Sequence, residues 1–370
     1  MRVRSRTLSL GLVVLVSLVG SVASPAVVAG AQSGPQQAQL TWMSIANWLI
    51  EVGGTRVVVN GYISRILESD FTGEGPTGLD KAKKPMKPEI DKVQRVIDAV
   101  GTNVDYILTG HSHFDHSWDT AVWARATGAQ VIGSKSTCLE LVAQGVPANQ
   151  CTMVKGGEKF DLGSGLTARA IRINHSGNPN TQPDLHDPLE LATVPVPDTA
   201  TGGLRPGILE DFPNGGGGVA FLVTFGDTNK PLSFFYADTG SEFTFDKPVI
   251  VDGENLGTPA NNIANAMRDA GLDSVDAAVE GGGAPLAKLI APIVKERAFI
   301  PNHWDGLYAP FFGGMPNEWS NPELEALMAN EGIGLFPPCQ YMEKWQIDST
   351  GVSIVPNAQM KQRLGFSECR

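Results

Sequence analysis

The sequence predicts a layered α/β fold, because strand-like and helix-like segments alternate along most of its length. Three observations carry this prediction. Apolar runs rich in β-branched residues lie on both sides of Gly53-Gly54, which is typical of a β-hairpin. Between residues 88 and 143 the apolar spacing changes repeatedly between that of a helix and that of a strand. The same alternation returns between residues 219 and 302.

The elements follow in order. The hairpin strands are expected at 40–52 and 55–59, and a loop rich in Gly, Pro and Lys follows at 71–87. The middle of the chain predicts helices at 88–100, 118–127 and 134–143, and strands at 105–108, 130–133, from 151 onward, and 166–174. The last third predicts strands at 219–225, 232–237, 277–280, 298–302, around Leu335 and within 343–355, and helices at 260–270, 286–295 and 322–329.

Residues 177–218 interrupt this pattern. Seven Pro, eight Gly and six acidic residues occur there, and Arg205 is the single basic residue. An irregular segment of this length inside a compact domain is often a lid or a binding loop. The alternative is an insertion without a role.

Composition restricts the function classes. Apolar residues make up 42% of the chain and charged residues 18%, which is ordinary for a globular protein. The formal net charge is −11, and removal of 1–31 with its three Arg would leave 25 basic against 39 acidic side chains, or −14. Such an acidic body repels phosphate backbones, so no nucleic-acid partner is expected.

The N-terminus has the layout of a secretory signal peptide at 1–31. Three Arg precede an apolar run from Leu8 to Val22, and Ala29-Gly30-Ala31 provides a small-x-small cleavage site. The run is shorter than a membrane span requires, so no stable membrane span is expected. The mature protein is therefore predicted to be secreted or held at the cell surface, with a flexible segment at 32–39 before the folded domain at 40–370.

The chemistry concentrates in His111-Ser112-His113-Phe114-Asp115-His116, between a predicted strand and a predicted helix. Three of the six His in the chain lie in this window, and imidazole and carboxylate suit zinc and its first-row neighbours. His111 and His113 share a face of an extended segment and can converge on one ion. Asp115 and His116 lie past the bend, which suggests a second ion. The alternative is a polar loop that happens to be rich in His.

This loop resembles the H-x-H-x-D-H signature of the metallo-β-lactamase superfamily. The resemblance implies a four-layer αββα sandwich, in which two mixed sheets are flanked by helices. It also implies later ligands, which match His175, Asp238 and His303, each after a strand-like run. His111, His113 and His175 would then hold one ion, Asp115, His116 and His303 a second, and Asp238 would bridge them.

The resemblance implies a hydrolase with two Zn²⁺ ions, with iron or manganese as alternative metals. A metal-bridging hydroxide would attack an ester, lactone, amide or phosphodiester bond of a small molecule or lipid, and Asp115 would help to orient it. Two alternatives stay open: an iron-dependent oxidoreductase on the same fold, and a catalytically silent metal-binding protein. The sequence does not define the oligomeric state.

Aromatic residues follow His303, with Gly and Pro between them. They either line an apolar substrate pocket or belong to the core, and the candidates are Trp304, Tyr308, Phe311 and Phe312. The candidates for the proton donor to the leaving group are His186, Asp305 and Tyr308.

Four cysteines in a chain with export features permit disulfide bonds. Proximity in the sequence favours Cys138–Cys151, and Cys339–Cys369 would fix the C-terminal tail. Free buried thiols are the alternative.

Overall fold

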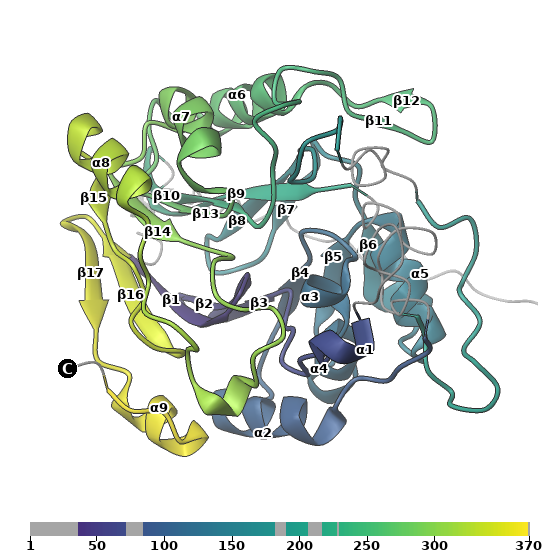
Figure 1. The fold of residues 1–370 in the computed structure, drawn as a ribbon. Coiled ribbons are helices and arrows are strands. Elements are labelled where there is room, and N and C mark those ends of the chain that lie inside the picture. The colour runs from purple at the N-terminus through teal and green to yellow at the C-terminus, as the bar shows by residue number, and fades with distance from the viewer. Residues whose placement is uncertain (1–35, 72–83, 182–189, 206–216, 228, 369–370) are drawn as a thin grey trace, which may run out of the picture. The chain divides into compact units, whose positions relative to one another are not determined.

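Two β-sheets and the helices outside them form the folded unit of this computed structural model (Figure 1). The structure describes residues 36–71, 84–181, 190–205, 217–227 and 229–368. The predicted signal peptide, His186 and Cys369 therefore lie outside the described residues. Among the helices of the described part, none combines the length and apolar character needed to cross a bilayer.

The first sheet has eight strands in the order β17-β16-β1-β2-β3-β4-β5-β6. Its strands are β1 (Gln37–Ser44), β2 (Asn47–Val52), β3 (Thr55–Val59), β4 (Tyr106–Leu108), β5 (Gln130–Gly133), β6 (Cys151–Met153), β16 (Glu343–Asp348) and β17 (Gly351–Val355). From β3 to β6 neighbouring strands are parallel, and the remaining pairs are antiparallel.

The second sheet has seven strands in the order β15-β14-β13-β10-β9-β8-β7. Its strands are β7 (Lys159–Asp161), β8 (Thr167–Arg172), β9 (Val219–Asp227), β10 (Lys230–Ala237), β13 (Ala277–Glu280), β14 (Ala298–Pro301) and β15 (Gly334–Leu335). A separate short ribbon is formed by β11 (Ile250–Val251) and β12 (Glu254–Asn255). Both large sheets are mixed, as the resemblance implied.

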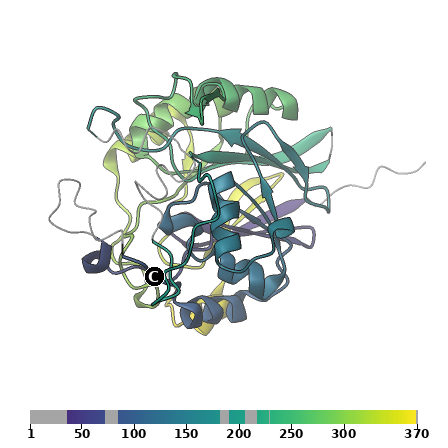
Figure 2. The same cartoon turned by 90° about the vertical axis from the view of Figure 1, so that its right-hand side faces the viewer.

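Helices cover the outer faces of both sheets, as Figures 1 and 2 show. The helices are α1 (Glu68–Phe71), α2 (Ile90–Val100), α3 (Phe114–Ser117), α4 (Thr120–Thr127), α5 (Lys135–Ala143), α6 (Pro259–Ala270), α7 (Gly283–Val294), α8 (Pro322–Glu331) and α9 (Ala358–Leu364). α6, α7 and α8 pack on the second sheet, and α2, α4, α5 and α9 belong to the side of the first. The structure is thus the predicted αββα sandwich.

The alternation of side chains along β9 explains how the layers form. Phe221 and Val223 join the large core cluster that contains both sheets, whereas Ala220 and Leu222 face α6 and α7. Successive strand side chains point to opposite faces, so one apolar run packs against the other sheet and a helix layer at once.

The N-terminal prediction differs from the structure in one respect. The run 40–52 is two strands, because the chain reverses after Ser44 (φ +140°) and Ile45 (φ +45°) and β2 pairs antiparallel with β1. The first strand also begins at Gln37, inside the segment predicted to be flexible. The elements α1, α3, α9, β7, β11 and β12 were not predicted, and α3 lies where the sequence indicated a loop before the helix at 118–127.

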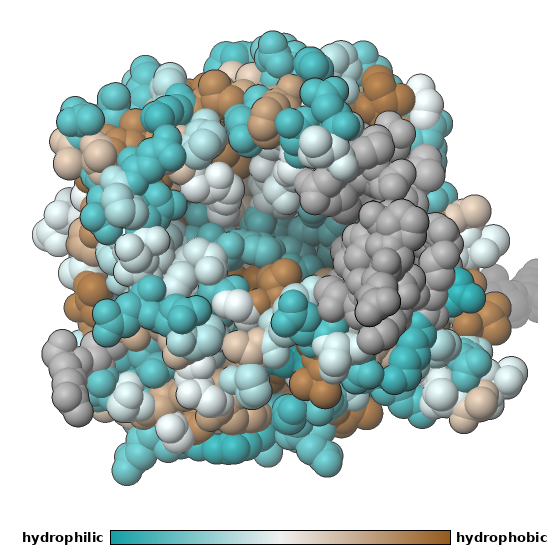
Figure 3. Space-filling model, in the orientation of Figure 1, coloured by the Kyte–Doolittle hydropathy of each residue, from teal (hydrophilic) through white to brown (hydrophobic). Residues whose placement is uncertain are grey.

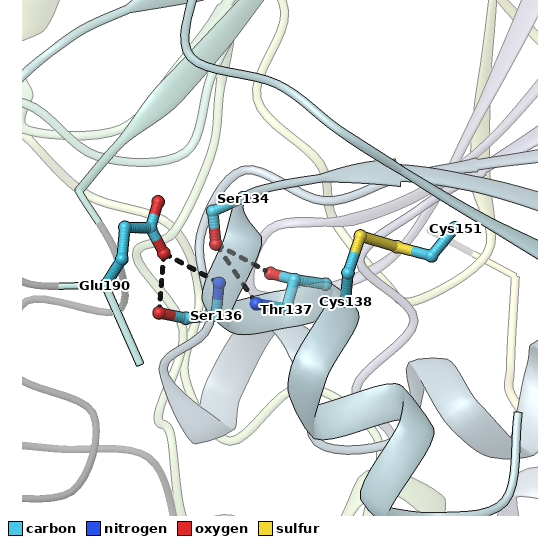
Figure 4. Close-up of a disulfide and its surroundings, with 6 residues drawn as sticks. All are labelled: Ser134, Ser136, Thr137, Cys138, Cys151 and Glu190. Carbon is cyan, nitrogen blue, oxygen red and sulfur yellow. Dashed lines mark hydrogen bonds between the residues drawn. A yellow bond between two sulfur atoms is a disulfide. The ribbon is translucent and has the colours of Figure 1, made fainter. Parts of the chain in front are cut away.

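The described parts of 177–218 contain no helix and no strand, in agreement with the irregular segment expected there. They are nevertheless attached to the domain. Met86 and Leu204 form an isolated antiparallel bridge, with N···O distances of 2.7 and 2.9 Å. Glu190 accepts hydrogen bonds from the backbone N–H and the hydroxyl of Ser136 at the start of α5, both at 2.6 Å (Figure 4).

Candidate metal centre

The metal loop, residues 111–116, follows β4 and ends inside α3. His111 and His113 lie before the helix, and His113 has the extended conformation of an N-cap residue (φ −65°, ψ 155°). Asp115 and His116 lie in α3. Gly110 precedes the loop, and a Cβ atom there would lie 1.9 Å from Asp238 Oδ2. Only glycine permits this close approach between the metal loop and the end of β10.

The other three candidate ligands follow strands of the second sheet. His175 follows β8, Asp238 follows β10, and His303 follows β14. These three strands run in the same direction, since β8 and β10 are both antiparallel to β9 and β10 is parallel to β13 and β13 to β14. Their ends therefore meet at one sheet edge, opposite the metal loop of the first sheet.

The seven predicted side chains come together in three overlapping groups. In each group one donor atom per residue lies within 4.8 Å of the others: His111 with His113 and His175; His111 with His116 and Asp238; Asp115 with His116 and His303. The first and third groups are the two ligand sets that the family resemblance implies. The middle group places Asp238 between them.

Asp238 uses its two oxygens differently. Oδ2 lies 3.0 Å from His116 Nδ1 and accepts a hydrogen bond from Asn60 Nδ2, also at 3.0 Å. Oδ1 lies 3.4 Å from His111 Nδ1 and has no hydrogen-bond partner. Oδ1 therefore has lone pairs that could hold an ion.

The side chains at the other end of the site are closer together. Asp115 Oδ2 lies 2.9 Å from His303 Nε2 and 3.2 Å from His116 Nε2, and the two Nε2 atoms are 3.2 Å apart. The His303 side chain is 25% exposed, whereas those of His116 and Asp238 are at most 1% exposed. The site is therefore open at His303 and closed at Asp238.

These residues fit a cation. Both ring nitrogens of His111, Nε2 of His113 and Oδ1 of Asp238 are buried without a hydrogen-bond partner. Such unpartnered polar atoms are expensive in a protein interior unless a ligand satisfies them. Imidazole nitrogens and carboxylate oxygens that face one another are the donor set of zinc and of iron.

The pKa values support the same conclusion. Burial, and then the neighbouring imidazoles, lower the pKa of His113 well below its usual value and that of His175 to about 3. Both rings are consequently neutral and can donate a lone pair. Burial opposes ionisation of Asp115 and Asp238, but His116 outweighs it and holds both pKa values well below the usual range.

Asn60 organises the site and was missed from the sequence. It follows β3 with φ +61°, and its Nδ2 lies 3.0 Å from both His116 Nδ1 and Asp238 Oδ2. Its Oδ1 accepts a hydrogen bond of 2.9 Å from the backbone N–H of Gly110. One amide thus connects both sheets and orients two candidate ligands, as outer partners of metal sites do. The only sequence signal was an Asn-Gly pair directly after a strand.

Of the four aromatic residues proposed for a pocket, two belong to the core. Phe311 is 1% exposed and stacks on Tyr341, with ring centroids 5.2 Å apart. Phe312 packs beside it, and the Arg95 guanidinium lies 4.1 Å above its ring. For these two, the core interpretation of the sequence holds, because Phe311 belongs to the large core cluster and Phe312 packs against it.

The other two lie nearer the site. Trp304 stacks on Trp42 at 5.6 Å and is partly buried. Tyr308 is half-buried and stacks on Phe114 of the metal loop at 6.2 Å. Burial, and then the Asp115 carboxylate, raises the pKa of Tyr308 to about 12, so its phenol stays protonated. Tyr308 is therefore the aromatic residue best placed to meet a substrate.

Asp305 has a structural role. Its two oxygens accept hydrogen bonds of 2.7 Å from the backbone N–H of Ile45 and from the Tyr341 hydroxyl. The N–H of His303, which has φ +56°, donates to Ile45 O at 3.0 Å. The turn between β1 and β2 thus holds the His303 loop in place, and Asp305 is not available as a proton donor.

The surface of the molecule is hollowed on the face that carries the α3 label in Figure 1. In the orientation of Figure 1, Figure 3 shows a depression with a hydrophilic floor near the middle of the face.

The predicted pairing of Cys138 with Cys151 is present, with Cα atoms 5.5 Å apart, and it links α5 to β6 (Figure 4). Cys339 is also disulfide-bonded, and the described cysteines include no free thiol.

Comparisons with known proteins found curated relatives that match part of the chain. A UPF0173 metal-dependent hydrolase from Pyrobaculum arsenaticum is 29% identical over 140 residues, which are 38% of this chain and 52% of that protein. The chain thus spans about half the length of the curated relatives it matches. No protein-family model matches.

Solved structures of similar fold include Igni18, a metallo hydrolase from Ignicoccus hospitalis, at 13% identity and a TM-score of 0.46, covering 84% of this chain and 99% of that one. An isothiocyanate hydrolase from Delia radicum gut bacteria has 13% identity and a TM-score of 0.47, with 83% and 98% covered. The metal loop and the two-sheet architecture thus resemble those of the metallo-β-lactamase superfamily, and the curated relatives that the chain matches over about half their length are metal-dependent hydrolases.

Proposed function

We propose that the protein is an exported, dinuclear zinc hydrolase that cleaves an ester, lactone, amide or phosphodiester bond of a small molecule or lipid. The observation that carries the proposal is that three groups of metal-binding side chains overlap, with His111 and His116 each belonging to two of them. The Asp238 carboxylate lies beside His111 of one ligand set and His116 of the other, so it would help to hold both ions. The curated relatives' description as metal-dependent hydrolases supports the reaction class.

His111, His113 and His175 would hold one ion, and Asp115, His116 and His303 the other. Bound ions of this kind supply a water of lowered pKa and polarise the substrate oxygen. The chain itself supplies orientation. Asp115 is ionised and lies at the open end, where its carboxylate can accept a proton from the attacking water and direct it.

The Tyr308 phenol stays protonated and its ring stacks on Phe114 of the metal loop, so it can donate a hydrogen bond to a substrate oxygen. Burial of Asp238, His111 and His113 excludes water from the closed end. Attack is therefore restricted to the side of His303.

Two measurements on the purified protein test the proposal. Elemental analysis should find about two zinc ions per chain, and two iron ions would point instead to the redox alternative. A panel of carbonyl and phosphorus substrates should then show turnover that chelation removes and zinc restores. Two bound zinc ions with no turnover on any substrate would support a silent metal-binding protein instead.

A further inference from the structure

We propose that Tyr236 is a positioning residue of the metal centre, which acts through the side-chain amide of Asn60. Tyr236 lies in β10, two residues before Asp238, and is 2% exposed. Its hydroxyl oxygen lies 3.1 Å from Asn60 Nδ2 and 2.7 Å from the carbonyl oxygen of Ala46. The inference rests on the proposed function, because its effect is on two of the candidate ligands for the metal ions.

The orientation of the Asn60 amide is fixed by its oxygen. Oδ1 accepts a hydrogen bond of 2.9 Å from the backbone N–H of Gly110, and the amide nitrogen could not accept it. Nδ2 therefore points to the other side of the group, where four polar atoms lie close to it. They are Ala46 O at 2.9 Å, His116 Nδ1 and Asp238 Oδ2 at 3.0 Å each, and the Tyr236 hydroxyl oxygen at 3.1 Å.

These four atoms compete for two hydrogens, because an amide nitrogen carries no more. The carbonyl oxygen of Ala46 can only accept, so the Tyr236 hydroxyl donates its hydrogen there. With that carbonyl supplied by the tyrosine, Asn60 can give one hydrogen to Asp238 Oδ2 and the other to the Tyr236 oxygen. Without the hydroxyl, the amide would have to serve Ala46 O as well as Asp238, and would turn away from the ligands.

The same arrangement sets the ring of His116. Both amide hydrogens are used elsewhere, so Nδ1 of His116 can donate its own hydrogen to Asp238 Oδ2 at 3.0 Å. A neutral imidazole with its hydrogen on Nδ1 keeps its lone pair on Nε2. Nε2 lies 3.2 Å from both Asp115 Oδ2 and His303 Nε2, the atoms of the second ligand set. The tyrosine hydroxyl thus helps to direct the His116 lone pair toward that set.

A purely structural role would use the other contact of Tyr236. Ala46 follows Ile45, whose carbonyl oxygen accepts the N–H of His303 at 3.0 Å. Loss of the bond to Ala46 O would then loosen this turn, by a route that does not pass through Asn60. The two roles therefore predict different results once the amide at position 60 is absent.

Zinc affinity of the folded full-length protein tests the inference, measured by competition with a chromogenic chelator. Tyr236→Phe keeps the ring and removes only the hydroxyl, and it should weaken the binding of one zinc ion about tenfold. Asn60→Gly removes the amide, and glycine tolerates the φ of +61° at this position. The double variant should bind zinc within about threefold of Asn60→Gly alone, because Tyr236 acts through that amide.

Tyr62→Phe is the matched control. Tyr62 is fully buried, and its hydroxyl oxygen accepts a hydrogen bond of 2.7 Å from the backbone N–H of Ile66. This variant loses a comparable buried bond and should bind zinc as the parent protein does. Its comparison with Tyr236→Phe is decisive even without the Asn60 variants, and circular dichroism checks that both proteins are folded.

Three results would overturn the inference: parent affinity in Tyr236→Phe, an equal loss of affinity in Tyr62→Phe, or losses that multiply in the double variant. A parent protein that binds no zinc would refute the proposed function as well. The expected pattern of zinc affinities in a protein without turnover would support the role of Tyr236 and refute the proposed hydrolase.

Discussion

Replacing Glu140 with Gln should stabilise the protein in alkaline solution. Glu140 lies in α5 and is 1% exposed, and its Oε2 accepts a hydrogen bond of 2.7 Å from the Ser117 hydroxyl. Its Oε1 has no partner. Burial raises the pKa of Glu140 from 4.5 to about 8, although the Ser117 bond opposes the shift. The folded protein therefore holds this proton more tightly than the unfolded chain does.

The sign of the pH dependence follows from linkage. Below pH 4.5 the carboxyl is protonated in both states and contributes no penalty. As the pH rises toward 8, the unfolded chain releases the proton first, and the free energy of unfolding falls. At 1.36 kcal/mol per pKa unit, the penalty is about 1 kcal/mol at pH 5 and about 5 kcal/mol at pH 9.

Glutamine keeps the shape and the acceptor for Ser117 but cannot ionise. Its amide group adds a donor beside the position of Oε1, which shifts stability by a constant of about 1–3 kcal/mol at every pH. The difference in unfolding free energy between Glu140→Gln and the parent protein should therefore increase by about 4 kcal/mol from pH 5 to pH 9.

Urea unfolding followed by circular dichroism, in chelator and without reductant, measures this difference. Metal-free conditions keep the titration of the metal-site histidines identical in both proteins. Glu318→Gln on the exposed loop before α8 is the control and should follow the parent at every pH. Parallel pH profiles for Glu140→Gln and the parent protein would refute the reasoning.

Three further substitutions test the metal centre. Asp238→Ala should reduce bound metal from two ions to one or none and remove turnover, and elemental analysis showing two ions with activity retained would refute the bridge. Asn60→Leu should weaken metal affinity about 10–100-fold, measured by competition with a chelator, because His116 and Asp238 lose a shared partner; unchanged affinity would show that the amide does not orient them. Gly110→Ala should lower metal content as strongly as Asp238→Ala, because the new Cβ would occupy the space of the Asp238 carboxylate. Gly128→Ala is the control: Gly128 lies at the exposed end of α4, and its Cβ would have nothing within 4 Å. This variant should retain both ions.

The fold could be predicted because its core elements carry local signals. Strands such as β9 and β10 are continuous apolar runs, and α2 has apolar residues at helical spacing. The elements that were missed lack such runs: β12 is two exposed polar residues, and β7 alternates charged residues around Phe160. Their position is decided by neighbouring strands, which a local pattern does not encode.

The turn between β1 and β2 could not be predicted either, because it has no local sequence signal. Ser44, Ile45 and Ala46 contain neither Gly nor Pro, so the run from 40 to 52 gave no turn signal. The positive φ of Ile45 is held instead by Asp305, 260 residues later in the chain. A conformation that depends on so distant a partner cannot be predicted from local sequence.

The candidate ligands could be predicted from the sequence and their supporting residues could not, and the reason is chemical. His and Asp are metal donors by type, so the spacing in the 111–116 loop indicated a metal site, and the family resemblance then pointed to His175, Asp238 and His303, which the structure brings to the same place. An amide or an aspartate that orients a ligand has no such signature, because Asn60 and Asp305 act through hydrogen bonds that exist only in the folded chain. The partners that fix a metal site are therefore harder to predict than its ligands, and Asn60 is the residue whose replacement separates the two roles: it should reduce metal affinity without removing a ligand.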